Sequence, residues 1–240
     1  MEFEFTTTQY TNNMMKNIGL TLFATAIVFA LASCGGEATE KATTTKKEVG
    51  APDTAKQKEN LADMVSNGIY KINTEKSVVG WKAAKVSGEH FGSVSVAQGS
   101  MEVKNELIAD AEIIMNMTTI TVDDMEGEYA EKLRGHLNSE DFFAVEQFPT
   151  AIFNLSGMKY VDGQYVASGS MQIKDTTGPV SFPVTLKNEN GAVVISGTAV
   201  IDRTKYGIKY GSGQFFDDLG DKMIYDEFEL KFTLFAEPRS

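Results

Sequence analysis

The sequence has little of the material from which disulfides, metal centres and nucleic-acid interfaces are built. Its 240 residues include one cysteine and two histidines. No disulfide can therefore form within the chain, and neither a multi-cysteine zinc site nor a histidine-rich site has enough ligands. Acidic residues outnumber basic ones by 33 to 22, which gives a net charge of -11. This charge would repel a phosphate backbone, so we expect no nucleic acid partner. The shortage of ligands predicts no metal site, and we expect no other cofactor.

The sequence also lacks the motifs of the common enzyme classes. It contains no Gly-x-Ser-x-Gly elbow, His-Glu-x-x-His pair, Walker loop or Gly-x-Gly-x-x-Gly fingerprint. We expect His90 in a glycine-flanked turn and His136 at the end of a helix, and neither has an evident catalytic partner. Three aspartates within residues 217–221 do not follow the spacing of an EF-hand and indicate a solvated acidic loop. The sequence thus favours a protein that is not an enzyme.

The N-terminal residues predict an export signal that ends at the cysteine. Residues 18–32 form an uncharged apolar run of 15 residues, shorter than the about 20 that span a bilayer. Small residues lie immediately before Cys34, and this pattern resembles the lipobox of bacterial lipoproteins, in which the cysteine is acylated and becomes the mature N-terminus. The alternative is that Cys34 is an ordinary apolar residue at the end of a membrane anchor. Residues 1–13 make a poor basic region, which a start at Met14 or Met15 would supply.

Three segments follow from this pattern. We expect residues 1–33 to be a signal peptide of the lipoprotein type, residues 34–66 a lipidated flexible tether, and residues 67–240 the folded domain. The tether has no aromatic residue and is rich in Thr, Lys, Glu and Ala, a composition that cannot bury enough apolar surface to fold. The lipobox resemblance implies palmitate on the cysteine and a place in the bacterial cell envelope. A glycine after Cys34, where some inner-membrane lipoproteins have aspartate, fits the outer membrane and a domain facing the periplasm.

The folded domain alternates apolar and polar residues between Gly, Asn and Asp turns, the pattern of an antiparallel sheet with one buried face. Residues 228–234 (FELKFTL) show the alternation most clearly. Pro183 lies within such a segment, so we expect it at a bulge or a loosely paired position. A closed eight-stranded antiparallel barrel would leave no edge strand and would enclose side chains or one small ligand. The expected strands are residues 77–86, 92–103, 107–118, 150–157, 164–174, 178–187, 192–202 and 224–236.

The long connection between the third and fourth strands contains the only expected helix of the domain. Met125, Tyr129 and Leu133 are spaced four apart and predict an apolar stripe on that helix. We expect this short helix to lie over one end of an all-β barrel.

The middle and the end of the domain carry a family resemblance. Residues 136–143 (HLNSEDFF) and 148–153 (FPTAIF) resemble the Ser-x-Asp-Phe-Phe and Phe-Pro-x-x-x-Phe pattern of the YceI-like proteins. Residues 202–208 (DRTKYGI) are similar to the Arg-x-x-Tyr/Phe-Gly-Ile turn of the same family, and residues 226–230 (DEFEL) lead into its closing strand.

The start of the domain extends this resemblance to residues 69–235. Residues 70–73 (YKIN) are similar to the family's opening Tyr-x-Ile-Asp, with Asn73 in place of Asp, and lead to the first strand at 77–81 (SVVGW). Residues 88–92 (GEHFG) match the following glycine-containing turn. The resemblance implies a lipocalin-like eight-stranded barrel in the bacterial envelope that binds a polyisoprenoid lipid.

Candidate ligand contacts are the large aromatic residues and methionines of this domain, although the same residue types build ordinary cores. Arg203, beside Tyr206, is a candidate for the polar head of a quinone or a phosphate, the alternative being a turn-stabilising hydrogen bond or ion pair. The candidate ligand-binding residues are Trp81, Phe91, Ile113, Met115, Met117, Phe142, Phe148, Phe153, Met171, Phe182, Arg203, Tyr206, Phe228 and Phe232.

These observations favour an envelope lipoprotein whose barrel binds, sequesters or carries a long isoprenoid lipid or a quinone-like molecule without catalysis. One alternative is an enzyme that acts on a lipid in the same cavity, for which His90 or Asp202 would be the inward titratable group. Another is a stress-response module that binds a protein partner through an exposed apolar patch. The sequence leaves open the identity of the ligand, the opening of the barrel and the formation of a homodimer.

Overall fold

The computed structural model describes Leu61 and residues 64–239. The expected signal peptide, Cys34 and most of the expected tether lie outside the described residues. No helix among the described residues is long and apolar enough to cross a membrane.

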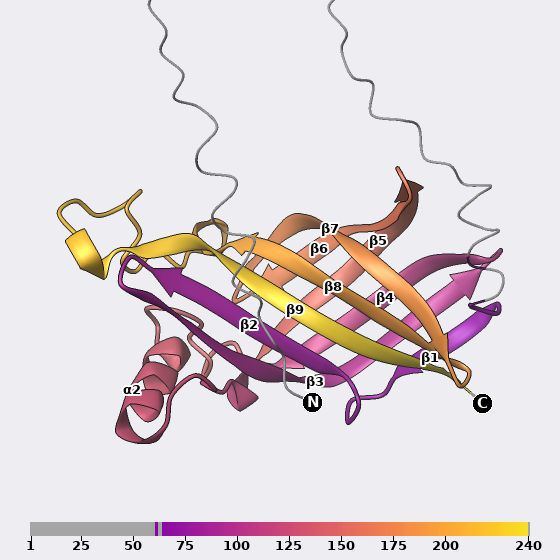
Figure 1. The fold of residues 1–240 in the computed structure, drawn as a ribbon, viewed down its shortest axis with the longest axis horizontal. Coiled ribbons are helices and arrows are strands. Elements are labelled where there is room, and N and C mark those ends of the chain that lie inside the picture. Colours follow the sequence, from indigo (N-terminus) through magenta and orange to yellow (C-terminus); the bar gives the residue numbers. More distant parts are fainter. Residues whose placement is uncertain (1–60, 62–63, 240) are drawn as a thin grey trace, which may run out of the picture. The chain divides into compact units, whose positions relative to one another are not determined.

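Nine strands make up the sheet, all paired antiparallel (Figure 1). The strands are β1 (Gly68–Ile72), β2 (Val78–Lys85), β3 (Gly88–Lys104), β4 (Leu107–Asn116), β5 (Thr150–Val161), β6 (Gln164–Ile173), β7 (Thr176–Glu189), β8 (Ala192–Asp202) and β9 (Ile224–Pro238). Within residues 64–239 the helices are α2 (Gly127–Asn138) and three short 3-10 helices, η2 (Met117–Thr119), η3 (Arg203–Tyr206) and η4 (Gly220–Lys222).

Eight of these strands close into a ring. Each of β2 to β9 pairs with two others of this set in the order β2-β9-β8-β7-β6-β5-β4-β3, and the pairing of β2 with β3 completes the circle. Closure gives every strand of the ring two partners, which removes the edge strands that would otherwise invite aggregation. The expected all-β fold, an eight-stranded antiparallel barrel with a short helix between its third and fourth strands, is confirmed.

The ninth strand, β1, was not expected from the sequence. It pairs with β3 (Tyr70 with Met101) and with β9 (Lys71 with Glu237), beyond the point where β2 begins at Val78. The five residues of β1 place only Tyr70 and Ile72 in the core, which is too short an alternation to identify a strand.

The long strands bend at irregular positions instead of breaking. The register of β3 shifts between Val96 and Gln98, and that of β5 between Leu155 and Gly157. Pro183 pairs with Val166 of β6 without a bulge, while the ladder of β7 with β8 starts only at the next residue. Pro183 therefore occupies a position paired on one side, where its missing N–H leaves no ladder bond unmade.

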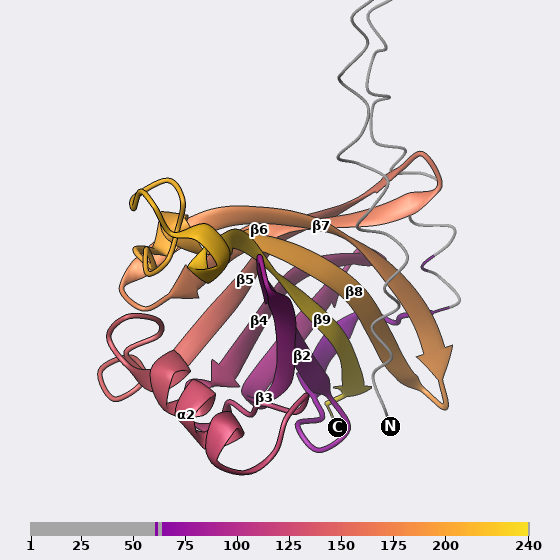
Figure 2. The same cartoon turned by 60° about the vertical axis from the view of Figure 1, so that its left-hand side comes forward.

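The α2 helix lies at one end of the barrel, called the helix end below (Figures 1 and 2). The apolar stripe expected for it is wrong in part. Met125 precedes the helix, and the side chain of Tyr129 is 79% exposed, whereas Leu137 is buried and Leu133 packs on the core. Only the last two turns of the helix pack on the core, and Tyr129 in the first turn therefore lies in solvent.

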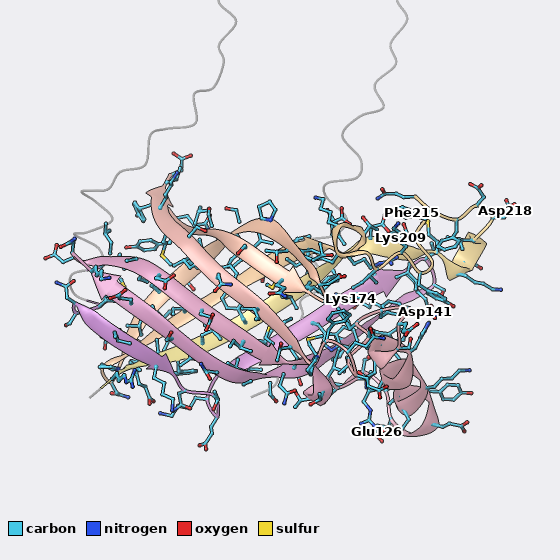
Figure 3. All side chains as sticks on the ribbon, turned by 180° about the vertical axis from the view of Figure 1, so that it is seen from behind. Glu126, Asp141, Lys174, Lys209, Phe215 and Asp218 are labelled. Carbon is cyan, nitrogen blue, oxygen red and sulfur yellow. The ribbon has the colours of Figure 1, made fainter. Side chains whose placement is uncertain are left out.

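The connection from η3 to β9 occupies the same end. Figure 3 shows Lys209, Phe215 and Asp218 at the same end of the barrel as Glu126 and Asp141, which flank α2. The ammonium of Lys209 lies 4.7 Å from the centre of the Phe215 ring. Four aromatic residues in this connection or at the start of β9 are 44–49% exposed: Tyr210, Phe215, Phe216 and Tyr225.

The opposite end carries the β7–β8 turn and the residues that precede β1. Leu61 and Val65 are buried there within the hydrophobic core, and the backbone carbonyl of Met64 accepts a hydrogen bond from Asn188 Nδ2 at 3.0 Å. These residues fall within the expected tether, and they extend the folded part of the chain towards its N-terminus.

Candidate functional site in the barrel interior

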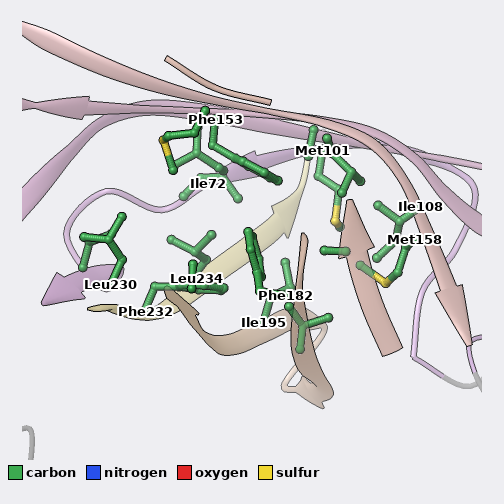
Figure 4. A pocket seen from close by; sticks show the side chains of 18 of the residues that line it. Ile72, Met101, Ile108, Phe153, Met158, Phe182, Ile195, Leu230, Phe232 and Leu234 are labelled. Atoms are coloured by element: carbon green, nitrogen blue, oxygen red, sulfur yellow. The ribbon is translucent and has the colours of Figure 1, made fainter. Parts of the chain in front are cut away.

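The inward faces of the strands leave two apolar compartments inside the barrel. The first has a volume of about 80 Å3, and its walls come from Ile72, Met101, Phe153, Phe182 and other apolar residues (Figure 4). The second has a volume of about 70 Å3 and lies towards the helix end, between Trp81, Phe228 and the residues after α2. For scale, a dry cavity of about 150 Å3 in a protein core binds benzene. Each compartment is thus about half that size, so a hydrocarbon segment enters it only as the surrounding side chains move apart.

Three side chains line both compartments: Met115 of β4, Met171 of β6 and Leu230 of β9. All three are buried, with exposed fractions of 5%, 4% and 9%. We call this set the waist. Methionine is unbranched and adapts its shape at little cost, so two of the three members can move aside for a guest.

Leu137, Phe142 and Phe143 bound the second compartment at the helix end. The backbone after α2 is fixed by local bonds, in which the N–H of Phe143 donates to the carbonyl of Leu137 at 3.1 Å and that of Ala144 to Ser139 at 2.8 Å. The phenylalanines of the motif at 136–143 thus form part of the wall.

Trp81 connects this compartment to the segment before α2. Its indole Nε1 donates to the backbone carbonyl of Thr121 at 3.0 Å, while the Thr121 N–H donates to the carbonyl of Ser93 at 2.9 Å. Gly92 lies directly beneath this crossing, where a Cβ would be 2.0 Å from the Thr121 oxygen. The approach requires glycine because any side chain would collide with the backbone.

Arg203 is the charged side chain at the wall of the second compartment. Its guanidinium is 5% exposed and donates to the backbone carbonyls of Tyr225 at 3.0 Å, Ile208 at 2.9 Å and Ile224 at 2.9 Å. Its Nη2 also lies 3.5 Å from Asp226 Oδ1. Burial lowers the pKa of the Arg203 guanidinium, and the carboxylates of Asp226 and Asp202 offset part of that effect. These contacts favour the turn-stabilising alternative over a head-group contact.

Asp202 and Tyr206 lie beside Arg203 but outside the walls of both compartments. Asp202 Oδ1 accepts from the Thr204 N–H at 3.0 Å and from its hydroxyl at 2.6 Å. Burial raises the pKa of the Asp202 carboxyl, but the bonds from Thr204 and the charge of Lys205 outweigh it, so the pKa lies below its ordinary value. Burial, together with the charge of Asp202, raises the pKa of Tyr206.

The lowered pKa of Asp202 predicts a pH-dependent stability. Since this pKa is lower in the folded chain than in the unfolded one, the charge stabilises the fold above the ordinary pKa, and that contribution is lost as the pH falls through the lowered value. Asp202→Asn keeps an oxygen for Thr204 and removes the charge. We expect it to lower the free energy of unfolding by less than about 1 kcal/mol at neutral pH, with the difference vanishing in acid. Urea unfolding across a pH series measures this, and a difference independent of pH would contradict it.

The two histidines form local contacts at the helix end. His90 lies within β3, not in the expected turn, because the turn between β2 and β3 occupies residues 86–87. Its Nδ1 is 2.8 Å from Asp124 Oδ2. His136, in the last turn of α2 as expected, contacts Asp141 Oδ2 at 3.2 Å and packs edge-on against Phe142. Neither histidine lines a compartment.

Metal ligands do not gather in the described part of the chain. Among Leu61 and residues 64–239, no group of three or more His, Cys, Asp or Glu side chains is arranged to hold a metal ion. The aspartates at 217–221 belong to the exposed connection between η3 and β9.

Most of the predicted ligand-binding residues surround the compartments. Three do not: Phe91 lies on the opposite face of β3 from Gly92 and Val94, Phe148 lies between the turn at 145–147 and β5, and Tyr206 is buried within η3. The residues that line at least one compartment are Trp81, Ile113, Met115, Met117, Phe142, Phe153, Met171, Phe182, Arg203, Phe228 and Phe232.

Sequence reasoning missed the aliphatic part of the wall. Leu230 and Leu234 alternate with the predicted Phe228 and Phe232 on one face of β9, so the same period-two pattern could have identified them. The other missed residues include Ile72, Val79, Met101, Ile108, Leu155, Met158, Val184 and Ile195.

The chain is similar in sequence to one known family and in fold to solved structures. A family model described as a YceI-like domain matches residues 70–236. The structure of BcnA from Burkholderia cenocepacia is similar with a TM-score of 0.55 at 20% identity, over 69% of this chain and 99% of that one. The structure of a polyisoprenoid binding domain from Saccharophagus degradans, implicated in plant cell wall breakdown, is similar with a TM-score of 0.52 at 11% identity, over 71% of this chain and 98% of that one. A comparison with curated proteins gave no match.

Proposed function

This chain belongs to the YceI-like family, whose domain spans residues 70–236, and we propose that its barrel binds a long isoprenoid lipid or a quinone-like molecule with an isoprenoid tail. The protein sequesters or carries this molecule and does not transform it. The polyisoprenoid binding named for the structural neighbour from Saccharophagus degradans supports the ligand class.

The observation that carries the proposal is the composition of the two compartments. Apart from Arg203 and Tyr225 at the helix end, their walls are apolar side chains, which come from all eight strands of the ring and also from β1, η2, α2 and connecting segments. Such a wall offers a guest desolvation and dispersion contacts, which suit a hydrocarbon chain. At about 25 cal/mol per Å2, burying a few hundred Å2 of isoprenoid contributes several kcal/mol before ordering costs.

Recovery of the bound lipid tests the proposal with a matched pair of variants. Ala199 of β8 lines the first compartment and is 2% exposed, whereas its neighbour Val200 is 54% exposed. We expect protein purified from its own host to yield an isoprenoid on organic extraction and mass spectrometry. Ala199→Phe fills the compartment and should reduce the yield about tenfold, while Val200→Phe should retain it.

The outcomes separate the alternatives. An empty wild-type barrel would overturn the proposal and leave an interaction module, with the exposed aromatic residues at 210–225 as its surface. Conversion of an added isoprenoid that is lost in His90→Ala or Asp202→Ala would favour the enzyme.

We further propose that Cys34 is acylated and holds the barrel at the outer membrane on its periplasmic side. The lipobox resemblance supports this, and the residue lies outside the described ones. We expect Cys34→Ala to lose metabolic labelling by a palmitate analogue and to leave the membrane fraction, whereas Ser33→Ala keeps both, because a small residue still precedes the cysteine. Labelling that persists in Cys34→Ala would exclude acylation at this site.

A further inference from the structure

We infer that the waist, formed by Met115, Met171 and Leu230, is the specificity-determining constriction of the barrel and selects guests by the width and length of their chain. This inference rests on the proposed function, because it assumes a hydrocarbon guest. It adds that the interior is two compartments in series, which only a slender and flexible chain can occupy together.

The topology places the three side chains around the barrel axis. In the ring of eight strands, three steps separate β9 from β6, two separate β6 from β4, and three separate β4 from β9. Side chains that point inward from strands spaced in this way converge on the centre from three directions. Because each one borders both compartments, they meet at one level between them.

The residue types suit a constriction that yields. Met115 and Met171 each have three rotatable side-chain bonds and a polarizable sulfur, so they can follow the outline of a chain that passes between them. The aromatic walls are stiffer: Phe153, Phe182 and Phe232 form a row with ring centres 5.4 Å and 5.5 Å apart in the first compartment. The wall thus fixes the width of a compartment, whereas the waist decides whether a guest extends from one compartment into the other.

The small volumes of the two compartments explain why the waist matters for long guests. Compartments of about 80 and 70 Å3 each hold only a short segment. A short prenol that enters the first compartment must expand it but leaves the waist in place, whereas a long polyprenol must also displace the methionines. The affinity for long chains should therefore respond to changes at the waist that leave the affinity for short chains unaltered.

Two leucines of β9 provide a matched test. Leu230 and Leu234 lie on the same face, are 9% and 8% exposed, and differ in that Leu234 lines only the first compartment. Leu230→Phe and Leu234→Phe therefore add the same volume at the waist and at one wall. Partition of radiolabelled geraniol, a short prenol, and solanesol, a long one, between the protein and phosphatidylcholine vesicles gives the affinity of each variant for both chains.

We expect Leu230→Phe to weaken solanesol binding about tenfold while geraniol binding stays within about twofold of the wild type. Leu234→Phe should weaken both by a similar factor. Met171→Ala widens the waist without overpacking and should raise the affinity for solanesol relative to geraniol, which keeps the test decisive if Leu230→Phe does not fold. If the ratio of solanesol affinity to geraniol affinity were the same in Leu230→Phe, Met171→Ala and the wild type, the waist would not select guests. The proposed function would then still stand. A wild-type protein that takes up neither alcohol would overturn the proposed function itself.

Discussion

Replacing Arg203 with methionine is expected to lower the free energy of unfolding by about 4 kcal/mol. The guanidinium donates to the carbonyls of Ile208, Ile224 and Tyr225, so it joins the end of η3 to the start of β9 across the long connection between them. Methionine fills similar space but leaves these carbonyl oxygens without their donor, and it leaves the Asp226 carboxylate without its cation. Urea unfolding followed by circular dichroism measures the loss.

Two further variants assign that loss to the buried network. Arg134 is exposed on α2 and pairs with Glu131, so Arg134→Met should change the free energy of unfolding by less than about 0.5 kcal/mol. Arg203→Lys keeps the charge but lacks the planar fork that reaches two chain segments, so we expect it to recover less than half of the loss. Full recovery by lysine would show that charge alone matters at this position.

Gly92→Ala is expected to destabilise the protein by about 3 kcal/mol and to disturb Trp81. The new Cβ would lie 2.0 Å from the Thr121 carbonyl oxygen and 2.8 Å from Trp81 Nε1, the two atoms of one hydrogen bond. The segment after η2 must therefore lift from β3, which exposes the indole to water. Since the chain has one tryptophan, a red shift of its emission reports this movement directly.

Gly157→Ala provides the matched control for Gly92→Ala. Gly157 also lies within a strand, at the irregular position of β5, but a Cβ there meets nothing within 4 Å. We expect a change of less than about 0.5 kcal/mol and no shift of the tryptophan emission. If both alanine variants lost similar stability, the effect would come from the strand backbone and not from the contact with Thr121.

The alternation of apolar and polar residues was enough to predict most of the strands, because each strand buries only one face. The alternation in residues 228–234 predicts β9 and its inward residues, since the opposite face meets water. The same rule could have placed Phe91 outside, because Gly92 and Val94 occupy the inward positions of β3. Phe91 was predicted as a ligand contact because it is aromatic, although its position in the alternation places it on the outer face of the strand.

Other features depend on contacts that no local pattern encodes. The role of Arg203 follows from carbonyl groups of residues 208, 224 and 225, which come together only in the closed barrel. Likewise, Met115, Met171 and Leu230 share a level because of the stagger between strands, which the sequence does not reveal. The sequence could therefore predict an apolar interior, but not its division into two compartments.

The last strand has a consequence for biogenesis. β9 pairs with β8, β2 and β1, and it is the last strand of the ring in chain order. A nascent chain cannot complete the circle until β9 has been synthesised, and until then β8 and β2 each expose an unpaired flank. We expect products that lack β9 to be substrates for chaperones and proteases, because the ring of strands stays open without it.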